Sequence, residues 1–334
     1  MHKAEGIKTL LRKKVLVLDG AMGSLIQGYK LSEADFRGGR FGAHEMNLKG
    51  NYDILSITNP EIISEMYRLY LEAGADIIKT NTFNATKFGQ ADYGTQDFVY
   101  EMNFQSARIA KSICKEYSTK NTNKPRLVAG SVGPTNKRLS LVENSFNPIA
   151  FKRSFHDLSD AYAEQYRGLF DGGVDLILIE TIFDIENAKA AIYAMEKVLN
   201  EKNMQIPFIL SVTINDDKGC ILSGQNLNEI VSTFSIAKPL VFGINCSFGV
   251  KHAMTFLEQL ASLTNSYICF YPNAGLPDKS GRYAESPENM AQNIKSLLDK
   301  QLINIVGGCC GTSPAHIKAI SEIVRKSVPR NLTN

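Results

Sequence analysis

The stretch DLILIET at residues 175–181 is an apolar run that ends in two polar residues. Four consecutive aliphatic side chains leave no polar face, which is typical of a parallel strand buried on both sides. Seven other short apolar runs occur along the chain, at Val15–Asp19, Asp76–Thr80, Arg126–Gly130, Pro207–Thr213, Leu240–Cys246, Tyr267–Tyr271 and Ile303–Val306. The chain therefore contains eight candidate parallel strands.

Longer amphipathic segments separate these runs and are expected to be helices. Pro60–Ala73 has Asn59 as a candidate N-cap, proline at its first position and Gly74 at its end. The other helix candidates are Asp97–Tyr117, Pro148–Phe170, Ile185–Asn200, Asn226–Phe234, Val250–Leu263, Pro287–Lys300 and Pro314–Lys326.

Eight β–α units in 334 residues predict an α/β fold, a (β/α)8 TIM barrel that forms a single domain over residues 1–330. The alternative is a doubly wound open sheet. The glycines of Asp19–Gly23 lack the Gly-x-Gly-x-x-Gly spacing that would favour that alternative. Residues 20–59 are too many for an ordinary connection, and we expect this insertion after the first strand to form a lid or a substrate-facing surface.

The composition excludes several classes of function. The chain has 37 Lys and Arg against 34 Asp and Glu, and no basic block, so neither nucleic acid nor a membrane is expected as a partner. The apolar run near the N-terminus, VLVL, is far too short for a signal peptide or a membrane span. We therefore expect a cytoplasmic protein, in which clustered cysteines indicate metal binding or catalysis rather than disulfides.

Three cysteines follow two of the candidate strands. Cys246 ends one run, and Cys309 and Cys310 come just after the last one. In a barrel the carboxyl ends of the strands converge on one mouth, where three sulfurs can reach one zinc ion at about 2.3 Å. We predict a catalytic zinc site with these three ligands and one open position. Three thiolates give the site a net negative charge, which suits a nucleophilic thiol better than hydrolysis.

The cysteines are also compatible with purely structural roles. A single buried cysteine is more often part of the core, and we assign Cys114, Cys220 and Cys269 to that class. A closed structural site would need a fourth ligand from Cys220 or Cys269. A disulfide between Cys309 and Cys310 would be strained.

Polar residues follow other strands and would face the same mouth. Asp19 and Glu180 could bind a substrate ammonium group, although each could equally cap a helix or fill the barrel. Asn273 could contact the substrate or act as a weak oxygen ligand, or it could belong to an ordinary turn.

Taken together, these motifs resemble the homocysteine S-methyltransferase family. The shared pieces span nearly the whole chain and are Asp19–Gly23, Asn81–Asn84, Gly130–Pro134, Ile179–Thr181, Asn245–Cys246, Pro272–Gly275 and Gly307–Thr312. The Gly-Gly-Cys-Cys-Gly element with an upstream Asn-Cys is the most specific of them.

The resemblance implies a zinc-bearing barrel that methylates the sulfur of L-homocysteine to give L-methionine. Carried over to this chain, the zinc ligands are Cys246, Cys309 and Cys310. The residues that would hold the amino-acid head group are Asp19, Gly20, Ala21 and Glu180, and Asn273 would lie beside the metal.

Two further motifs bear on the methyl donor. Ala34–Gly38 and Leu48–Asn51 resemble the N-terminal homocysteine-binding module of cobalamin-dependent methionine synthase. This resemblance implies methylcobalamin as donor, carried by a separate corrinoid module or protein, with the chain either an excised module or a standalone subunit. Lys79 departs from the acid found there in many relatives. The alternatives are S-methylmethionine or betaine as donor, or a non-catalytic zinc- or thiol-binding protein.

Overall fold

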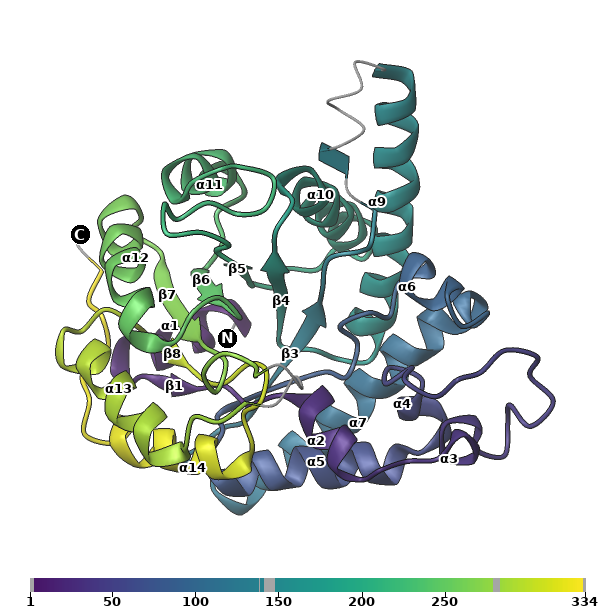
Figure 1. Ribbon diagram of the computed structural model, residues 1–334, viewed down its shortest axis with the longest axis horizontal. Coiled ribbons are helices and arrows are strands. Elements are labelled where there is room, and N and C mark those ends of the chain that lie inside the picture. Colours follow the sequence, from purple (N-terminus) through teal and green to yellow (C-terminus); the bar gives the residue numbers. More distant parts are fainter. Residues whose placement is uncertain (1–2, 138, 141–147, 279–282, 333–334) are drawn as a thin grey trace.

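The strands of the protein form one closed barrel. The computed structural model describes residues 3–137, 139–140, 148–278 and 283–332. Within these residues, eight parallel strands lie in the order β1-β8-β7-β6-β5-β4-β3-β2, and a parallel bridge between Leu18 and Ile77 joins β1 to β2. Figure 1 shows these strands at the centre of the molecule. The strands are β1 Leu16–Val17, β2 Ile77–Lys79, β3 Leu127–Val132, β4 Leu176–Ile182, β5 Phe208–Val212, β6 Val241–Asn245, β7 Tyr267–Tyr271 and β8 Ile305–Val306.

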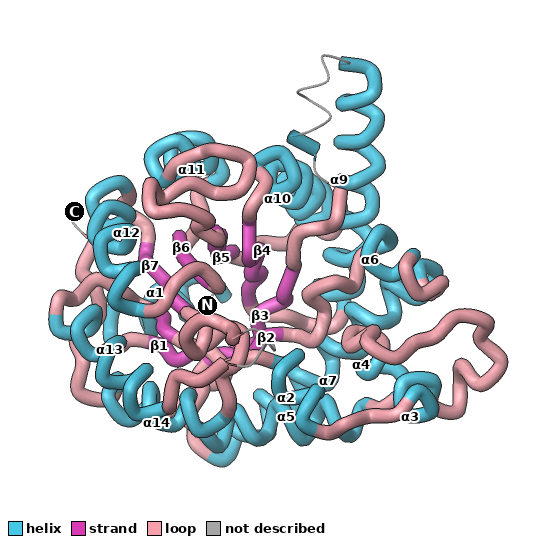
Figure 2. Tube along the Cα trace, viewed as in Figure 1, coloured by secondary structure: helices cyan, strands magenta, loops and turns pink. Residues whose placement is uncertain are grey.

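Helices surround this barrel (Figure 2). Those that follow the strands are α5 Pro60–Ala73, α7 Val99–Lys120, α9 Pro148–Asp171, α10 Ile185–Glu201, α11 Leu227–Phe234, α12 Val250–Leu263, α13 Pro287–Asp299 and α14 Pro314–Val324. The predicted TIM barrel is confirmed, and so are the predicted bounds of β7, α5 and α12. Asn59 precedes α5 but its side chain makes no capping hydrogen bond. Among the described residues, no helix combines the length and the apolar character that crossing a bilayer requires.

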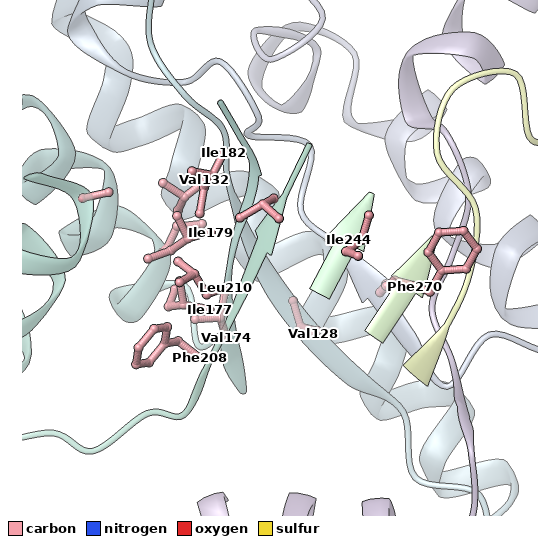
Figure 3. Packing of buried hydrophobic residues seen from close by; sticks show 14 of the residues in the cluster. Val128, Val132, Val174, Ile177, Ile179, Ile182, Phe208, Leu210, Ile244 and Phe270 are labelled. Carbon is pink, nitrogen blue, oxygen red and sulfur yellow. The ribbon is translucent and has the colours of Figure 1, made fainter. Parts of the chain in front are cut away.

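Alternate residues of each strand face opposite sides of the barrel wall. In β4, Ile177 and Ile179 point outward and pack in the layer between the sheet and the helices (Figure 3). Leu176 and Leu178 belong to a second cluster, inside the barrel. This alternation directs the next residue of the series, Glu180, inward. A continuous apolar run is thus explained by two separate cores, one on each face of the sheet.

The first helix, α1 (Lys3–Lys13), contributes to the interior cluster. Ile7 and Leu11 are buried against inward-facing strand residues such as Leu16 and Tyr267. Asn304 donates a hydrogen bond from Nδ2 to the carbonyl oxygen of Leu11 at 3.4 Å. The helix therefore packs against the amino-terminal half of the barrel interior.

The insertion between β1 and β2 contains α2 (Met22–Gly28), α3 (Glu33–Arg37) and α4 (Leu55–Thr58). Glu33 accepts hydrogen bonds from the backbone N–H groups of Leu48 and Lys49 and pairs with Arg37 at 2.7 Å. The Arg37 guanidinium also donates to the carbonyl oxygens of residues 41, 44 and 46. These contacts fix the long loop after α3, which lies away from the barrel in Figure 1.

Candidate active site

A cavity of about 520 Å³ lies at the carboxyl ends of the strands. Its wall includes Cys246, Cys309 and Cys310 together with residues from the insertion, among them residues 20–24 and 50–53. The insertion therefore faces the cavity, where the chemistry of a TIM barrel is expected.

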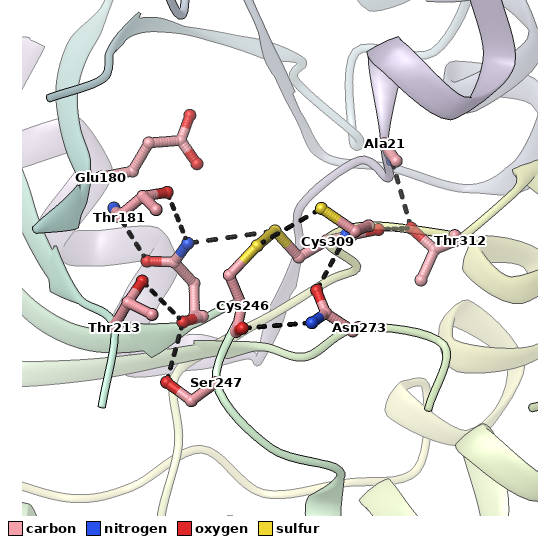
Figure 4. The surroundings of a disulfide bond; sticks show 12 residues. Ala21, Glu180, Thr181, Thr213, Cys246, Ser247, Asn273, Cys309 and Thr312 are labelled. Atoms are coloured by element: carbon pink, nitrogen blue, oxygen red, sulfur yellow. Dashed lines mark hydrogen bonds between the residues drawn. A yellow bond between two sulfur atoms is a disulfide. The ribbon is translucent and has the colours of Figure 1, made fainter. Parts of the chain in front are cut away.

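The three cysteines meet at one side of this cavity, and we call them the sulfur cluster. One ligand atom from each lies within 4.8 Å of the others. The sulfurs of Cys246 and Cys310 are 3.6 Å apart, and a disulfide joins Cys246 to Cys309 (Figure 4). The expectation of free thiols is therefore not met at Cys246 and Cys309, because the two converging loops bring their sulfurs into bonding contact.

This disulfide also differs from the pairing of Cys309 with Cys310 that the sequence left open. The Cα atoms of Cys246 and Cys309 are 5.6 Å apart, a separation common for disulfides. Adjacent residues such as Cys309 and Cys310 are instead constrained by their shared peptide bond. The cross-loop pair is thus the one that ordinary disulfide geometry allows.

Asn273 ties the two cysteine loops together. Its Nδ2 donates to the carbonyl oxygen of Cys246 at 3.1 Å, and its Oδ1 accepts from the N–H of Cys310 at 3.1 Å. Figure 4 shows Asn273 beside Cys246 and Cys309. The structure thus brings this predicted residue to the sulfur cluster, where its amide is engaged with the backbone of both loops.

Asn245 is a second supporting residue, and its role was not predicted from the sequence. It is fully buried. Its Oδ1 accepts from Ser211 and from the N–H of Thr181, while its Nδ2 donates to Thr181 Oγ1 and lies 3.9 Å from the sulfur of Cys309. The signal available in the sequence was its place directly before Cys246, in the shared Asn245–Cys246 motif.

Two backbone positions shape the loops. Cys246 has a φ of 56°, in the left-handed region that residues other than glycine rarely adopt. Gly311 has a φ of 77°, and a Cβ there would collide with Tyr283. The strained turn at Cys246 directs its sulfur toward the other loop, and Gly311 lets that loop bend closely after Cys310.

The donor set suits a zinc ion once the disulfide is reduced. At a Zn–S distance of about 2.3 Å, two sulfurs of a tetrahedral site lie about 3.8 Å apart. The 3.6 Å between Cys246 and Cys310 is close to that value, and the third sulfur lies within the same small volume. Three thiolates with an open side toward the cavity correspond to the ligand number of a catalytic zinc site.

Lys79 and Glu180 also line the cavity, and together with Asp19 we call them the charged cluster. Lys79 Nζ pairs with Asp19 Oδ1 at 2.7 Å, and the N–H of Lys79 donates to Asp19 Oδ2 at 2.8 Å. The side chain of Asp19 is 0% exposed and that of Lys79 is 11% exposed. Lys79 lines the cavity, whereas Asp19 lies behind it. Asp19 can therefore act on a molecule in the cavity chiefly through Lys79.

Glu180 also lines the cavity and is buried. Its Oε1 accepts a hydrogen bond of 2.6 Å from Ser131 Oγ. Burial raises the pKa of Glu180, and the charge of Lys79 opposes that change. Burial lowers the pKa of Lys79, but the negative charges of Asp19 and Glu180 raise it by more. The pKa of Lys79 therefore lies above its ordinary value.

Gly20 and Ala21, predicted to contact the substrate through their backbone, are both at the cavity wall. The carbonyl oxygen of Gly20 accepts from Lys79 Nζ at 3.3 Å. The N–H of Ala21 donates to Thr312 Oγ1 at 3.1 Å, and its carbonyl oxygen accepts from Tyr70. These contacts connect the end of β1 to the loop that carries Cys309 and Cys310.

Two further polar residues of the cavity were not predicted as site residues. Asp53 accepts a hydrogen bond from the N–H of Asn84, and burial raises its pKa to about 7. Asn81 donates to the carbonyl oxygen of Tyr52 at 2.7 Å. Both contacts join the insertion to the segment after β2. Asn81 belongs to one of the shared motifs, but nothing in the sequence signals a partner almost thirty residues earlier.

Residues 16–324 match the family model described as homocysteine S-methyltransferase. The chain belongs to this family. It is accordingly a methyltransferase, as the sequence motifs predict.

Solved structures agree with the barrel of this family. The homocysteine methyltransferase MmuM from Escherichia coli is similar in its metallated form, with a TM-score of 0.70, 22% identity and coverage of 96% of this chain and 99% of that one. Its oxidised form has a TM-score of 0.71 at the same identity and coverage. At this identity the likeness establishes the fold.

Proposed function

We propose that the protein transfers a methyl group to the thiolate of L-homocysteine and forms L-methionine. The observation that carries this proposal is the convergence of three cysteine sulfurs on a cavity that also holds a charged cluster. A thiol amino acid has the complementary parts, a sulfur at one end and a charged head group at the other. In this arrangement the side chain of the acceptor spans the space between the two clusters.

Zinc is the ion we propose for the sulfur cluster, with Cys246, Cys309 and Cys310 as its ligands. When bound, it would lower the pKa of a coordinated acceptor thiol and keep the resulting thiolate nucleophilic at neutral pH. Asn273 and Asn245 hold the cysteine loops in the geometry that this requires. The proton of the acceptor thiol is released to solvent.

The remaining residues position the acceptor. We propose that Glu180 binds its ammonium group, that Asp19 acts through Lys79, and that Gly20 and Ala21 form the adjacent wall. In the transfer, a bond forms between the acceptor sulfur and the methyl carbon while the bond from that carbon to the donor breaks. The electron pair of the broken bond stays with the donor, and aligned approach of the two reactants provides much of the rate.

For the donor we propose methylcobalamin, presented by a corrinoid module or protein. Support comes from the motifs at Ala34–Gly38 and Leu48–Asn51. The first contains buried Phe36 and the arginine that fixes the insertion loop, and the second supplies Gly50 and Asn51 to the cavity wall.

The test is a methylation assay on reduced, zinc-loaded protein with four separate donors: free methylcobalamin, a methylated corrinoid protein, S-methylmethionine and betaine. Methionine formed from the corrinoid donors supports the whole proposal. Methionine formed only from S-methylmethionine or betaine would mean that the proposed donor is wrong and that the proposed acceptor is right. Tight homocysteine binding without methionine from any donor would indicate a binding protein and overturn the catalytic proposal.

A further inference from the structure

The proposed function gives Lys79 no contact of its own with the acceptor. Residues 77 and 79 of β2 alternate with Ile78, so that Ile77 joins the interior cluster and Lys79 points inward as well. At the end of the strand its side chain reaches the cavity wall. A buried lysine that lines a cavity places a full positive charge where an acceptor would bind.

Among the described residues, the hydrogen bonds of Lys79 leave one of its N–H donors without an acceptor. A lysine ammonium group has three N–H bonds. One is directed to Asp19 Oδ1 at 2.7 Å and another to the carbonyl oxygen of Gly20 at 3.3 Å. Asp19 fixes the group further by accepting the backbone N–H of Lys79. The ring of Tyr271 lies on another side, 5.4 Å from Nζ. The ammonium group is thus held in place with one N–H free to meet an acceptor atom in the cavity.

Glu180 offers the opposite charge in the same cavity. Its Oε1 is engaged by Ser131, and Tyr271 lies beside the carboxylate as well. Glu180 lies close enough for its charge to act on Lys79, although the two do not form a direct ion pair within 4.0 Å. Lys79 and Glu180 thus present a cation and an anion to one cavity without pairing directly. They are complementary to an amino acid, whose carboxylate and ammonium groups are attached to the same carbon atom.

We propose that Lys79 binds the α-carboxylate of the acceptor amino acid and so makes that carboxylate a requirement for binding. This inference rests on the proposed function for the identity of the acceptor. Asp19 positions Lys79, and Glu180 takes the ammonium group. The protein selects a thiol amino acid over a simple thiol by this pair of opposite charges.

The test compares three thiols of the same chain length: homocysteine, 3-aminopropane-1-thiol, which lacks the carboxylate, and 4-mercaptobutanoate, which lacks the amine. Their dissociation constants are measured by calorimetry on reduced, zinc-loaded protein. We expect loss of the carboxylate to weaken binding to the natural protein about 10- to 100-fold, the range for a charge-assisted hydrogen bond. In Lys79→Met, homocysteine should lose a similar factor, while 3-aminopropane-1-thiol should lose little.

Lys87→Met is the matched control, because Lys87 is an exposed lysine that pairs with Glu164 outside the cavity. It should leave all three constants unchanged. Should Lys79→Met not fold because Asp19 is left buried without a partner, Asp19→Asn/Lys79→Met removes both charges and takes its place in the comparison.

The outcomes separate this inference from the proposed function. If homocysteine binds but the preference for a carboxylate persists without Lys79, the inference is wrong and the proposed function stands. If 4-mercaptobutanoate binds the natural protein as tightly as homocysteine, the ammonium group adds nothing to binding, and selection by a pair of opposite charges is overturned. If none of the three thiols binds, the proposed function fails first.

Discussion

The sulfur cluster and the charged cluster lie in one cavity but are held in different ways. The sulfur cluster depends on local geometry, since Asn273 joins the two cysteine loops and Cys246 adopts a left-handed backbone conformation. The charged cluster depends on a pair between neighbouring strands, where Lys79 of β2 meets Asp19 at the end of β1. Substitutions in the sulfur cluster should change metal content. Substitutions in the charged cluster should change acceptor affinity while metal content stays constant.

The largest effect is expected from Cys309→Ala. Loss of one of three thiolates should remove zinc and lower methyl transfer more than about 1000-fold, since a metal ion contributes several kcal/mol to such a reaction. Zinc content by elemental analysis and the rate of methionine formation measure it. Cys220→Ala, in a loop outside the cavity, serves as the control and should keep both. Full activity in a zinc-free Cys309 variant would refute the role of the metal.

Asn273→Ala should have a smaller effect on the same side of the cavity. Removing its two hydrogen bonds frees both cysteine loops, so zinc affinity should fall about 10- to 100-fold, as is usual for residues that support metal ligands. Competition with a chelator measures this affinity. Asn289→Ala, exposed on α13, is the matched control. An unchanged affinity would mean that the cysteine loops hold their geometry without the bridge.

Glu180→Gln tests the charged cluster. The neutral amide should weaken homocysteine binding about 10-fold, because it loses the charge that attracts the ammonium group, and it should leave zinc content intact. Binding of 4-mercaptobutanoate, which has no amine, should hardly change. Glu201→Gln, in an exposed pair with Arg167, is the control. Equal losses for both thiols would argue against contact between Glu180 and the amine.

The smallest effect concerns stability and pH. The folded pKa of Asp53, about 7, lies above its ordinary value of 3.8, because burial disfavours the charged form. Between these values the folded state holds a proton that the unfolded state has released, so stability should fall as pH rises from about 4 to about 7. Asp53→Asn should remove this part of the slope and raise the free energy of unfolding by about 1–3 kcal/mol at pH 8. Denaturant unfolding at pH 5 and pH 8 measures the difference, and an equal gain at both pH values would contradict the assignment.

The sequence predicted the barrel because apolar runs and helix ends are local signals. Strand β7 and helix α12 have the predicted bounds, and the cysteines after β6 and β8 meet because the topology of a barrel brings those ends together. The contacts of Lys79 are only partly predictable from the sequence. Its inward direction follows from the alternation of residues in β2, but its pairing with Asp19 depends on closure between the first two strands. The packing of α1 against the barrel interior also depends on tertiary structure, which a short amphipathic segment does not reveal.

The packing of Ile7 and Leu11 inside the barrel has a kinetic consequence. Because α1 packs against the amino-terminal end of the barrel interior, we expect the proposed acceptor and donor to approach from the carboxyl-terminal end, where the cavity lies. The insertion lines the same cavity as the cysteines, so we expect the proposed acceptor to enter before a bulky donor covers the entrance. Initial-rate kinetics should then follow an ordered sequence in which homocysteine binds first and methionine leaves last.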